Sequence, residues 1–193
     1  HGADIVITSA TKYLNGHSDI IAGAIAGTSA VIEEATRLMR LWGPAIDPHA
    51  AWLTERGLKT LALRVERHHV NALAVAQWAA GREEFSAVHH PGLVTHPDHE
   101  LATRLFAGYG GMVGLVLEGG TAAAQRFLSH LRLVTHAPSL AGVESLVSEP
   151  RLTSHKALGA AERAALGIPD GFLRLSCGCE DTDDLLADLA GAL

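Results

Sequence analysis

The sequence predicts a fold that mixes strands with helices, of the α/β or α+β class. Short apolar runs alternate with helix-like patterns over most of the chain, which is the main observation behind this prediction. In addition, 48% of the 193 residues are hydrophobic, which is enough to bury a substantial core. The chain contains no internal repeat and no low-complexity segment, so a solenoid or a disordered tail is not expected.

The first quarter of the chain predicts two strands and a helix. Residues 3–8 form a β-branched apolar run, which predicts a buried strand, and the apolar run 20–27 predicts its neighbour. A polar loop connects them over residues 9–19. Ser29 is expected to cap the helix that follows, with three apolar residues directed inward, namely Ile32, Leu38 and Leu41.

A long helical pattern follows two prolines, Pro44 and Pro48, and extends over residues 49–80. Its apolar residues recur at helical spacing, and Gly57 weakens it enough to divide it into two helices. Beyond Gly81, strands are predicted at 85–89, 112–117, 132–135, 145–147 and 172–176. Helices are predicted from Asp98 to about Gly108 and over 122–131, 160–166 and 181–193.

The polar loop after the first predicted strand contains Lys12, one of only three lysines in the chain. A lysine that forms a Schiff base must lie beside a pocket and be able to lose its proton. Ser9 and Thr11 flank it with hydroxyls that can hydrogen-bond a phosphate, and loops after sheet strands commonly carry ligand chemistry in α/β folds. From these residues alone, an ordinary lysine in a polar strand–helix connection is the alternative interpretation.

The segment from Ser9 to Asp19, with His1-Gly2-Ala3-Asp4 before it, resembles the lysine signature of the Cys/Met metabolism family of pyridoxal 5′-phosphate (PLP) enzymes. This transsulfuration family includes cystathionine γ-synthase, cystathionine γ- and β-lyases, methionine γ-lyase and O-acetylhomoserine sulfhydrylase. The resemblance continues in the same order through four further segments, residues 55–61, 90–99, 139–146 and 174–176.

The resemblance implies a role for five residues. Lys12 would form the Schiff base with PLP and move protons at the substrate carbons, and Ser9 and Thr11 would bind the phosphate. Arg174 matches the arginine that binds the substrate α-carboxylate, for which a guanidinium is well suited. Ser139 matches a serine whose segment places that carboxylate. Without the family, Arg174 could face solvent on a strand and Ser139 could be a turn residue.

The resemblance also implies the architecture. We expect the α/β fold of the type I PLP-dependent transferases, which is that of aspartate aminotransferase. Residues 1–57 would end the large PLP-binding domain, and residues 58–193 would form the small C-terminal domain. The family's ring-stacking tyrosine, its pyridine-binding aspartate and its glycine-rich phosphate loop lie upstream of the lysine. We therefore expect these 193 residues to be an incomplete enzyme, inactive alone, from a homotetramer built of dimers.

The reaction implied by the resemblance is β or γ elimination or replacement on sulfur-containing or O-acylated amino acids. Cystathionine γ-synthase or γ-lyase is the expected type, with cystathionine β-lyase, methionine γ-lyase and O-acetylhomoserine sulfhydrylase as alternatives. Two departures leave β and γ chemistry open. Pro138 stands where some γ-acting members have Glu, and Ala141 stands where many members have Gly.

Composition excludes several other classes. The net charge is −6 and no basic cluster is present, so nucleic-acid binding is not expected. No apolar stretch reaches membrane-spanning length, and two cysteines are too few for a disulfide scaffold, so we expect a cytoplasmic protein. Cys177 and Cys179 form one short pair without a second, so no metal site is expected despite 12 histidines. A non-catalytic folding or oligomerisation module remains the alternative from another class.

Overall fold

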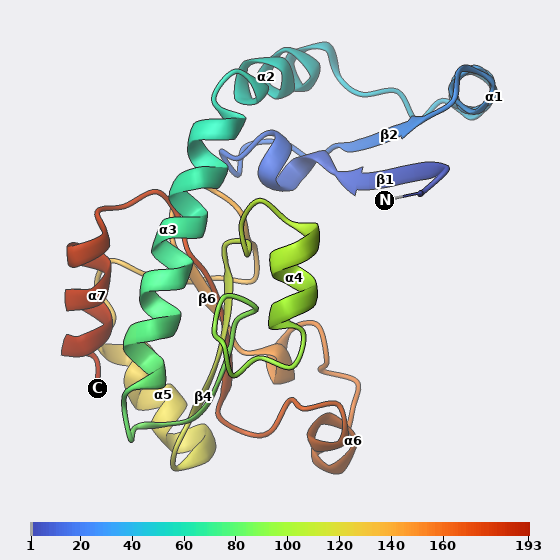
Figure 1. Ribbon diagram of the computed structural model, residues 1–193. Helices are drawn as coiled ribbons and strands as arrows, with labels where there is room; N and C mark the ends of the chain where they lie inside the picture. Colours follow the sequence, from blue (N-terminus) through green and yellow to red (C-terminus); the bar gives the residue numbers. More distant parts are fainter. Residues whose placement is uncertain (1) are drawn as a thin grey trace. The chain divides into compact units, whose positions relative to one another are not determined.

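The computed structural model describes residues 2–193 and divides into two compact units, His1–Ala62 and Leu63–Leu193 (Figure 1). His1, the first residue of the lysine signature, lies outside the described residues. No helix among the described residues is both long enough and apolar enough to cross a membrane. Each unit has its own sheet, and the two are taken in turn.

The first unit is built on an antiparallel pair of strands. β1 (Ile5–Ser9) pairs with β2 (Gly23–Gly27) in a register that places Ile5 opposite Gly27. A short π-helical turn, η1 (Ala10–Leu14), follows β1 directly and belongs to the connection between the strands. Both predicted strands are therefore present, and the connection is more ordered than the expected loop.

The prediction that β1 is buried is wrong for this chain. All five residues of β1 are exposed, with Ile7 at 78%, although they are β-branched or hydroxyl residues that favour strands. The reason is that β1 is hydrogen-bonded only to β2 among the described residues, so no second layer shields its side chains. Apolar composition indicated a strand correctly, but burial depends on what packs against it.

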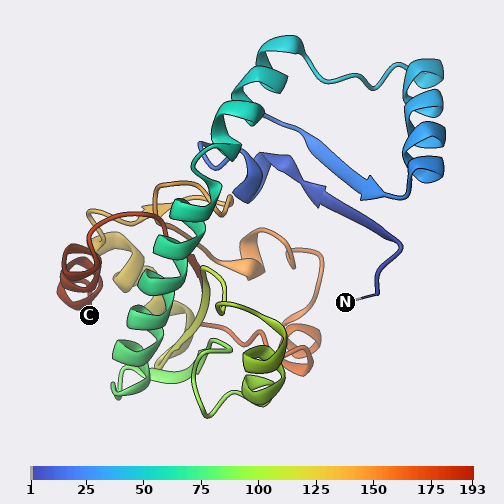
Figure 2. The ribbon, with the colours of Figure 1, turned by 45° about the horizontal axis from the view of Figure 1, so that its top comes forward.

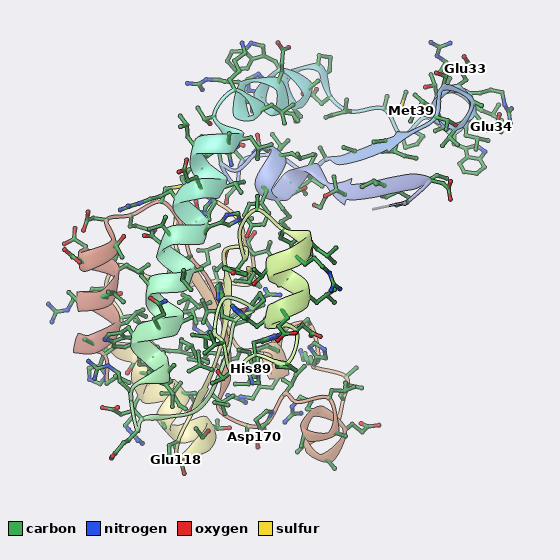
Figure 3. The ribbon with its side chains drawn as sticks, in the orientation of Figure 1. Glu33, Glu34, Met39, His89, Glu118 and Asp170 are labelled. Atoms are coloured by element: carbon green, nitrogen blue, oxygen red, sulfur yellow. The ribbon has the colours of Figure 1, made fainter. Side chains whose placement is uncertain are left out.

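Two helices complete the first unit. α1 (Ser29–Trp42) follows β2 in the chain (Figure 2). It begins after Thr28, not after the expected cap Ser29, and ends at Gly43, whose φ of 84° is the left-handed conformation of a helix C-cap. None of its residues is buried, so the expected inward-facing stripe is not observed, and Leu41 is 69% exposed. Glu33, Glu34 and Met39 project from this helix in Figure 3.

α2 (Pro48–Leu58) has a stronger start signal. The Asp47 side chain accepts hydrogen bonds from the backbone N–H groups of His49 and Ala50, at 2.9 and 3.1 Å. Pro48 occupies the first helical turn, where its missing N–H costs nothing. The long predicted helix does divide near Gly57, because α3 (Leu61–Ala80) begins as a separate helix.

The second unit contains a five-stranded mixed sheet in the order β3-β4-β7-β6-β5. Its strands are β3 (Phe85–His89), β4 (Met112–Leu117), β5 (Thr135–His136), β6 (Leu146–Ser148) and β7 (Phe172–Ser176). All pairings are antiparallel except that of β5 with β6. This strand–helix composition agrees with the predicted α/β class.

Three helices cover one face of this sheet, namely α3, α5 (Gly120–His130) and α7 (Thr182–Gly191). In Figure 1 they lie on one side of the strands, and α4 (His99–Leu105) lies on the other. The core between them joins alternate strand residues to small and branched helix residues; it includes Val113, Leu115, Leu173, Leu175, Val75, Phe127 and Leu185. The unit is completed by η2 (Pro150–Leu152) and α6 (Ala160–Ala165).

Two fully buried histidines couple the stability of this unit to pH. Burial lowers the pKa of His68 and of His90, because an imidazolium ion would lose its hydration there. Below the ordinary imidazole pKa of about 6.5, an unfolded chain binds protons that the folded chain cannot. We expect the free energy of unfolding to fall as pH decreases from about 6.5 to 5, by up to about 1.4 kcal/mol per pH unit for each histidine.

Urea unfolding between pH 8 and 5 checks this expectation. His90→Asn should flatten the pH dependence of the unfolding free energy, and His136→Asn, at an exposed position, should not. A wild-type stability that rises on acidification through this range would contradict the burial of neutral imidazoles.

Candidate functional site

The lysine turn begins where β1 ends. Ser9 is the last residue of β1, and Thr11 and Lys12 lie in η1, so the three predicted residues are contiguous in the first unit. Lys12 departs from helical geometry, with φ −89° and ψ −128°. Its side chain is half-buried, whereas the other two lysines of the chain, Lys59 and Lys156, are exposed. Lys12 is thus the least exposed of the three lysines.

Thr11 fastens the turn to the start of the second strand. Its hydroxyl accepts a hydrogen bond from the Ala22 N–H at 3.0 Å and donates to the Ala22 carbonyl at 3.3 Å. The Thr11 backbone N–H also donates to the Ala22 carbonyl, at 3.2 Å. The hydroxyl proton is therefore used within the protein, which leaves the exposed Ser9 as the freer of the two predicted phosphate donors.

Asn15 supports the other end of the turn, a role that its place in the lysine motif did not indicate. Its side chain is 1% exposed and donates to the Asp19 carboxylate at 2.7 Å, and its backbone N–H donates to the Ala10 carbonyl at 3.0 Å. The His17 ring donates from Nδ1 to the Asn15 carbonyl at 2.7 Å. A Cβ on Gly57 of α2 would lie 2.3 Å from that carbonyl oxygen, so helix and turn make backbone contact.

Arg174 lies in the middle of the five-stranded sheet, on the face opposite the helical core. The register places it between Gly114 of β4 and Ser148 of β6, and His89 of β3, labelled in Figure 3, pairs with Gly114. These four residues form one row across four strands. The guanidinium Nη2 of Arg174 donates to the Pro138 carbonyl at 3.3 Å, and Arg174 forms no ion pair within residues 2–193.

The segment containing Ser139 is held against the end of β7. The Ala141 N–H donates to the Ser176 hydroxyl at 2.8 Å, and both residues are buried. Ala141 adopts a left-handed conformation, with φ 66°, which explains why glycine is acceptable at such a position. This bond, and the hydrogen bond from Arg174 to the Pro138 carbonyl, hold the segment that contains Ser139 beside Arg174.

A tight turn after β7 anchors this arrangement to helix α3. The Glu180 carboxylate accepts hydrogen bonds from the backbone N–H and the hydroxyl of Ser145, and the Gly178 N–H donates to that hydroxyl at 2.8 Å. The Asn71 amide donates to the Gly178 and Glu180 carbonyls, and the Arg67 guanidinium also donates to Glu180. Sequence inspection missed Asn71 and Glu180, because their partners are more than 30 residues away.

The structure provides no metal centre among residues 2–193. No group of three or more histidine, cysteine, aspartate or glutamate side chains could hold an ion there. Both cysteines are free, and Cys177 is buried at the end of β7. Burial raises the pKa of the Cys177 thiol far above its ordinary value, which leaves it protonated and unreactive.

The comparison with known sequences decides the family. The family model described as "Cys/Met metabolism PLP-dependent enzyme" matches residues 1–193. The chain belongs to this family. It is 44% identical over its whole length to cystathionine γ-synthase of Mycobacterium leprae and 44% identical to cystathionine β-lyase of Coxiella burnetii, and covers 49% and 50% of those proteins. Equal identity to a synthase and a β-lyase leaves the reaction type open.

Solved structures agree on the fold. Cystathionine γ-synthase from Xanthomonas oryzae pv. oryzae, in complex with aminoacrylate and cysteine, superposes with a TM-score of 0.94 at 45% identity. The match covers 99% of this chain and 50% of that one. The expected type I PLP-dependent fold is therefore confirmed for the part present, and the chain spans about half the length of the relatives it matches.

The residues of the lysine turn suit PLP chemically. A half-buried lysine and an exposed serine lie within four residues of each other on a turn held at both ends by hydrogen bonds, which suits a phosphate cofactor held covalently by an amine. Thr11 fits less well as a phosphate donor, because Ala22 takes its hydroxyl proton. Of the three predicted residues, Lys12 and Ser9 therefore fit the cofactor better than Thr11 does.

Proposed function

We propose that the protein containing this chain catalyses PLP-dependent β or γ elimination or replacement on sulfur-containing or O-acylated amino acids. Cystathionine γ-synthase or γ-lyase is the favoured type, and cystathionine β-lyase, methionine γ-lyase and O-acetylhomoserine sulfhydrylase are the alternatives. The observation that carries the proposal is the half-buried Lys12 on a braced turn at the end of β1, in a chain of this family.

Each proposed site residue has a separate task. The Lys12 Nζ would hold the cofactor covalently and then remove or return the proton at the substrate α-carbon. Ser9 would donate to the phosphate, and Thr11 would keep the turn in place through Ala22. Arg174 would bind the substrate carboxylate, with the Ser139 segment closing beside it. Bound PLP supplies the electron sink that makes α-proton removal feasible.

The proposed assembly follows the resemblance. Residues 1–57 would belong to the large cofactor-binding domain and residues 58–193 to the small domain, within a cytoplasmic homotetramer of dimers acting on small amino acids. The exposed β1–β2 pair supports this assignment, because an uncovered apolar strand pair is normally shielded by further structure. We propose that these 193 residues alone do not turn over substrate and that the longer protein does.

Mapping a reduced cofactor adduct tests the proposal. The purified chain, and the longer protein that contains it, would be incubated with PLP, scanned for a yellow absorbance band, reduced with borohydride and digested for mass spectrometry. We expect the adduct on the peptide containing Lys12 and not on Lys59 or Lys156. An adduct spread over the three lysines in proportion to their exposure would contradict the proposed site.

A non-catalytic module is the second candidate, favoured by one observation. The unit Leu63–Leu193 has its own sheet and core, as a domain that acts only in folding or subunit contact would have. Such a module would stay colourless with PLP even in the longer protein, whereas the proposed enzyme would turn yellow there.

A further inference from the structure

Ser148 presents a buried hydroxyl beside Arg174. It is the last residue of β6 and is directly opposite Arg174 in the antiparallel β6–β7 pair, so both side chains lie on the same face of the sheet. Directly opposed residues have Cβ atoms about 4.5 to 5.5 Å apart. Val147, the preceding residue, faces the opposite side and packs into the hydrophobic core. The Ser148 side chain therefore lies on the same face of the sheet as Arg174, opposite the hydrophobic core.

Neither Ser148 nor Arg174 has its hydrogen-bonding capacity satisfied by the protein. Ser148 is 1% exposed, and its hydroxyl has no hydrogen-bond partner in the described chain. The Arg174 Nε is likewise buried without a partner there, and only Nη2 has one, the Pro138 carbonyl. Leaving a buried polar group unpaired is costly, so two such groups on adjacent residues indicate a shared polar ligand.

The surroundings define the chemistry of that ligand. The nearest carboxylate along the chain, Glu149, is bound by Arg151 at 2.8 Å and does not neutralise Arg174. On the other flank of Arg174, Gly114 has no side chain and therefore offers no polar group, and the Phe172 ring and the His89 Cβ occupy the space where its Cβ would lie. An anion that accepts from an arginine N–H and a hydroxyl at once is most simply a carboxylate.

We propose that Ser148 and Arg174 together bind the α-carboxylate of the amino-acid substrate, with the Ser148 hydroxyl as a second donor. The proposal rests on the proposed function, since it assigns a further binding residue to the same site. It assigns Ser148 to ligand binding and not to the stability of the fold, because its hydroxyl forms no hydrogen bond within residues 2–193.

The first test uses the Tm to distinguish a role of Ser148 in ligand binding from a role in stabilising the fold. In the 193-residue chain, Ser148→Ala should leave the Tm unchanged or raise it, because it removes a buried hydroxyl that has no partner. Ser145→Ala is the matched control: that serine is also fully buried, but its hydroxyl bonds Glu180 and the Gly178 N–H. This control should lower the Tm by about 2 to 8 °C. A similar loss for Ser148→Ala would assign Ser148 to the fold and overturn the proposal.

The second test uses two amines that differ by one carboxylate. In the longest natural protein containing this chain, loaded with PLP, binding of L-alanine and of ethylamine would be followed by the cofactor's absorbance. Ser148→Ala should weaken L-alanine binding by about 10-fold to 100-fold, the range for a hydrogen bond to a charged group, and leave ethylamine unaffected. Ser148→Cys, which preserves volume and donates weakly, should behave in the same way.

The variant Arg174→Lys distinguishes failure of the inference about Ser148 from failure of the proposed function. If this variant weakens L-alanine selectively and Ser148→Ala does not, the inference about Ser148 fails and the proposed function stands. If Arg174→Lys also leaves L-alanine binding unchanged, the carboxylate site of the proposed function fails. Equal weakening of L-alanine and ethylamine by Ser148→Ala would overturn the inference, because the lost contact would not involve the carboxylate.

Discussion

Replacing Lys12 by alanine should lower turnover by the PLP-loaded protein by about 1,000-fold or more. The variant would lose both the covalent attachment of the cofactor and the base at the α-carbon, and the general-base contribution alone is about 10² to 10⁴. Its neighbours should persist, because Thr11 and Asn15 hold the turn through bonds that do not involve the lysine side chain. Steady-state release of the leaving group from cystathionine measures the effect.

Lys59→Ala is the matched control for this experiment. Lys59 is exposed at the end of α2, so its loss should change turnover by no more than about twofold, as is usual for a surface substitution. Adding methylamine should restore part of the Lys12→Ala rate, because a free amine can act as the missing base. Turnover by Lys12→Ala within tenfold of wild type would remove the basis for the proposed function.

Gly57→Ala should disrupt the lysine turn from outside the site. An added Cβ would lie 2.3 Å from the Asn15 carbonyl oxygen and 2.9 Å from the Asn15 Cα, and both contacts are with backbone that cannot rotate away. Helix α2 and the turn must therefore separate, at a cost of about 1 to 3 kcal/mol or more. We expect a lower unfolding free energy and faster hydrogen exchange at the amides of Asn15 and Gly16, which close the turn onto Ala10 and Lys12.

Gly191→Ala provides the same chemical change at an open position. Gly191 ends α7, and a Cβ there would meet no atom within 4 Å. This variant should be neutral or more stable by up to about 1 kcal/mol, because alanine favours a helix over glycine. If Gly57→Ala is equally well tolerated, with unchanged exchange at Asn15, the close contact between α2 and the turn does not exist in solution.

The fold was predictable where local pattern and burial agree. β3, β4 and β7 have the predicted bounds, because their apolar runs are flanked by turn residues and also pack on one helical layer. β5 begins at Thr135, three residues after its predicted start at Arg132, because two backbone N–H groups, those of Arg132 and Val134, bond the Asp188 carboxylate instead of a strand. That competition involves a residue more than 50 positions away, which no local pattern contains.

The residues of the candidate site also divide into those that the sequence indicated and those that only the structure shows. Lys12 and Arg174 were found because the resemblance gives each of them a role. Asn15 and Ser176 lie in the same motifs but were assigned no role, and Ser148 lies outside the motifs. What distinguishes them is burial and pairing: Asn15 is 1% exposed, and Ser148 is opposite Arg174 only because of the β6–β7 register. Strand register over short antiparallel pairs follows from tertiary packing, so this second set becomes visible only in the structure.

The turn that follows β7 is held by hydrogen bonds to its main chain and by the Glu180 carboxylate. His68, Asn71 and Arg67 bond carbonyls of residues 177, 178 and 180, and the Cys179 N–H donates to the Val143 carbonyl. Neither thiol takes part in these bonds, and the Cys179 Sγ has only two long contacts, at 3.9 Å from the Arg64 carbonyl oxygen and 3.9 Å from the His68 Nε2. Replacing both cysteines with apolar residues of similar size should leave the main-chain bonds in place, which would give a thiol-free background for attaching spectroscopic labels without altering the geometry that supports Arg174.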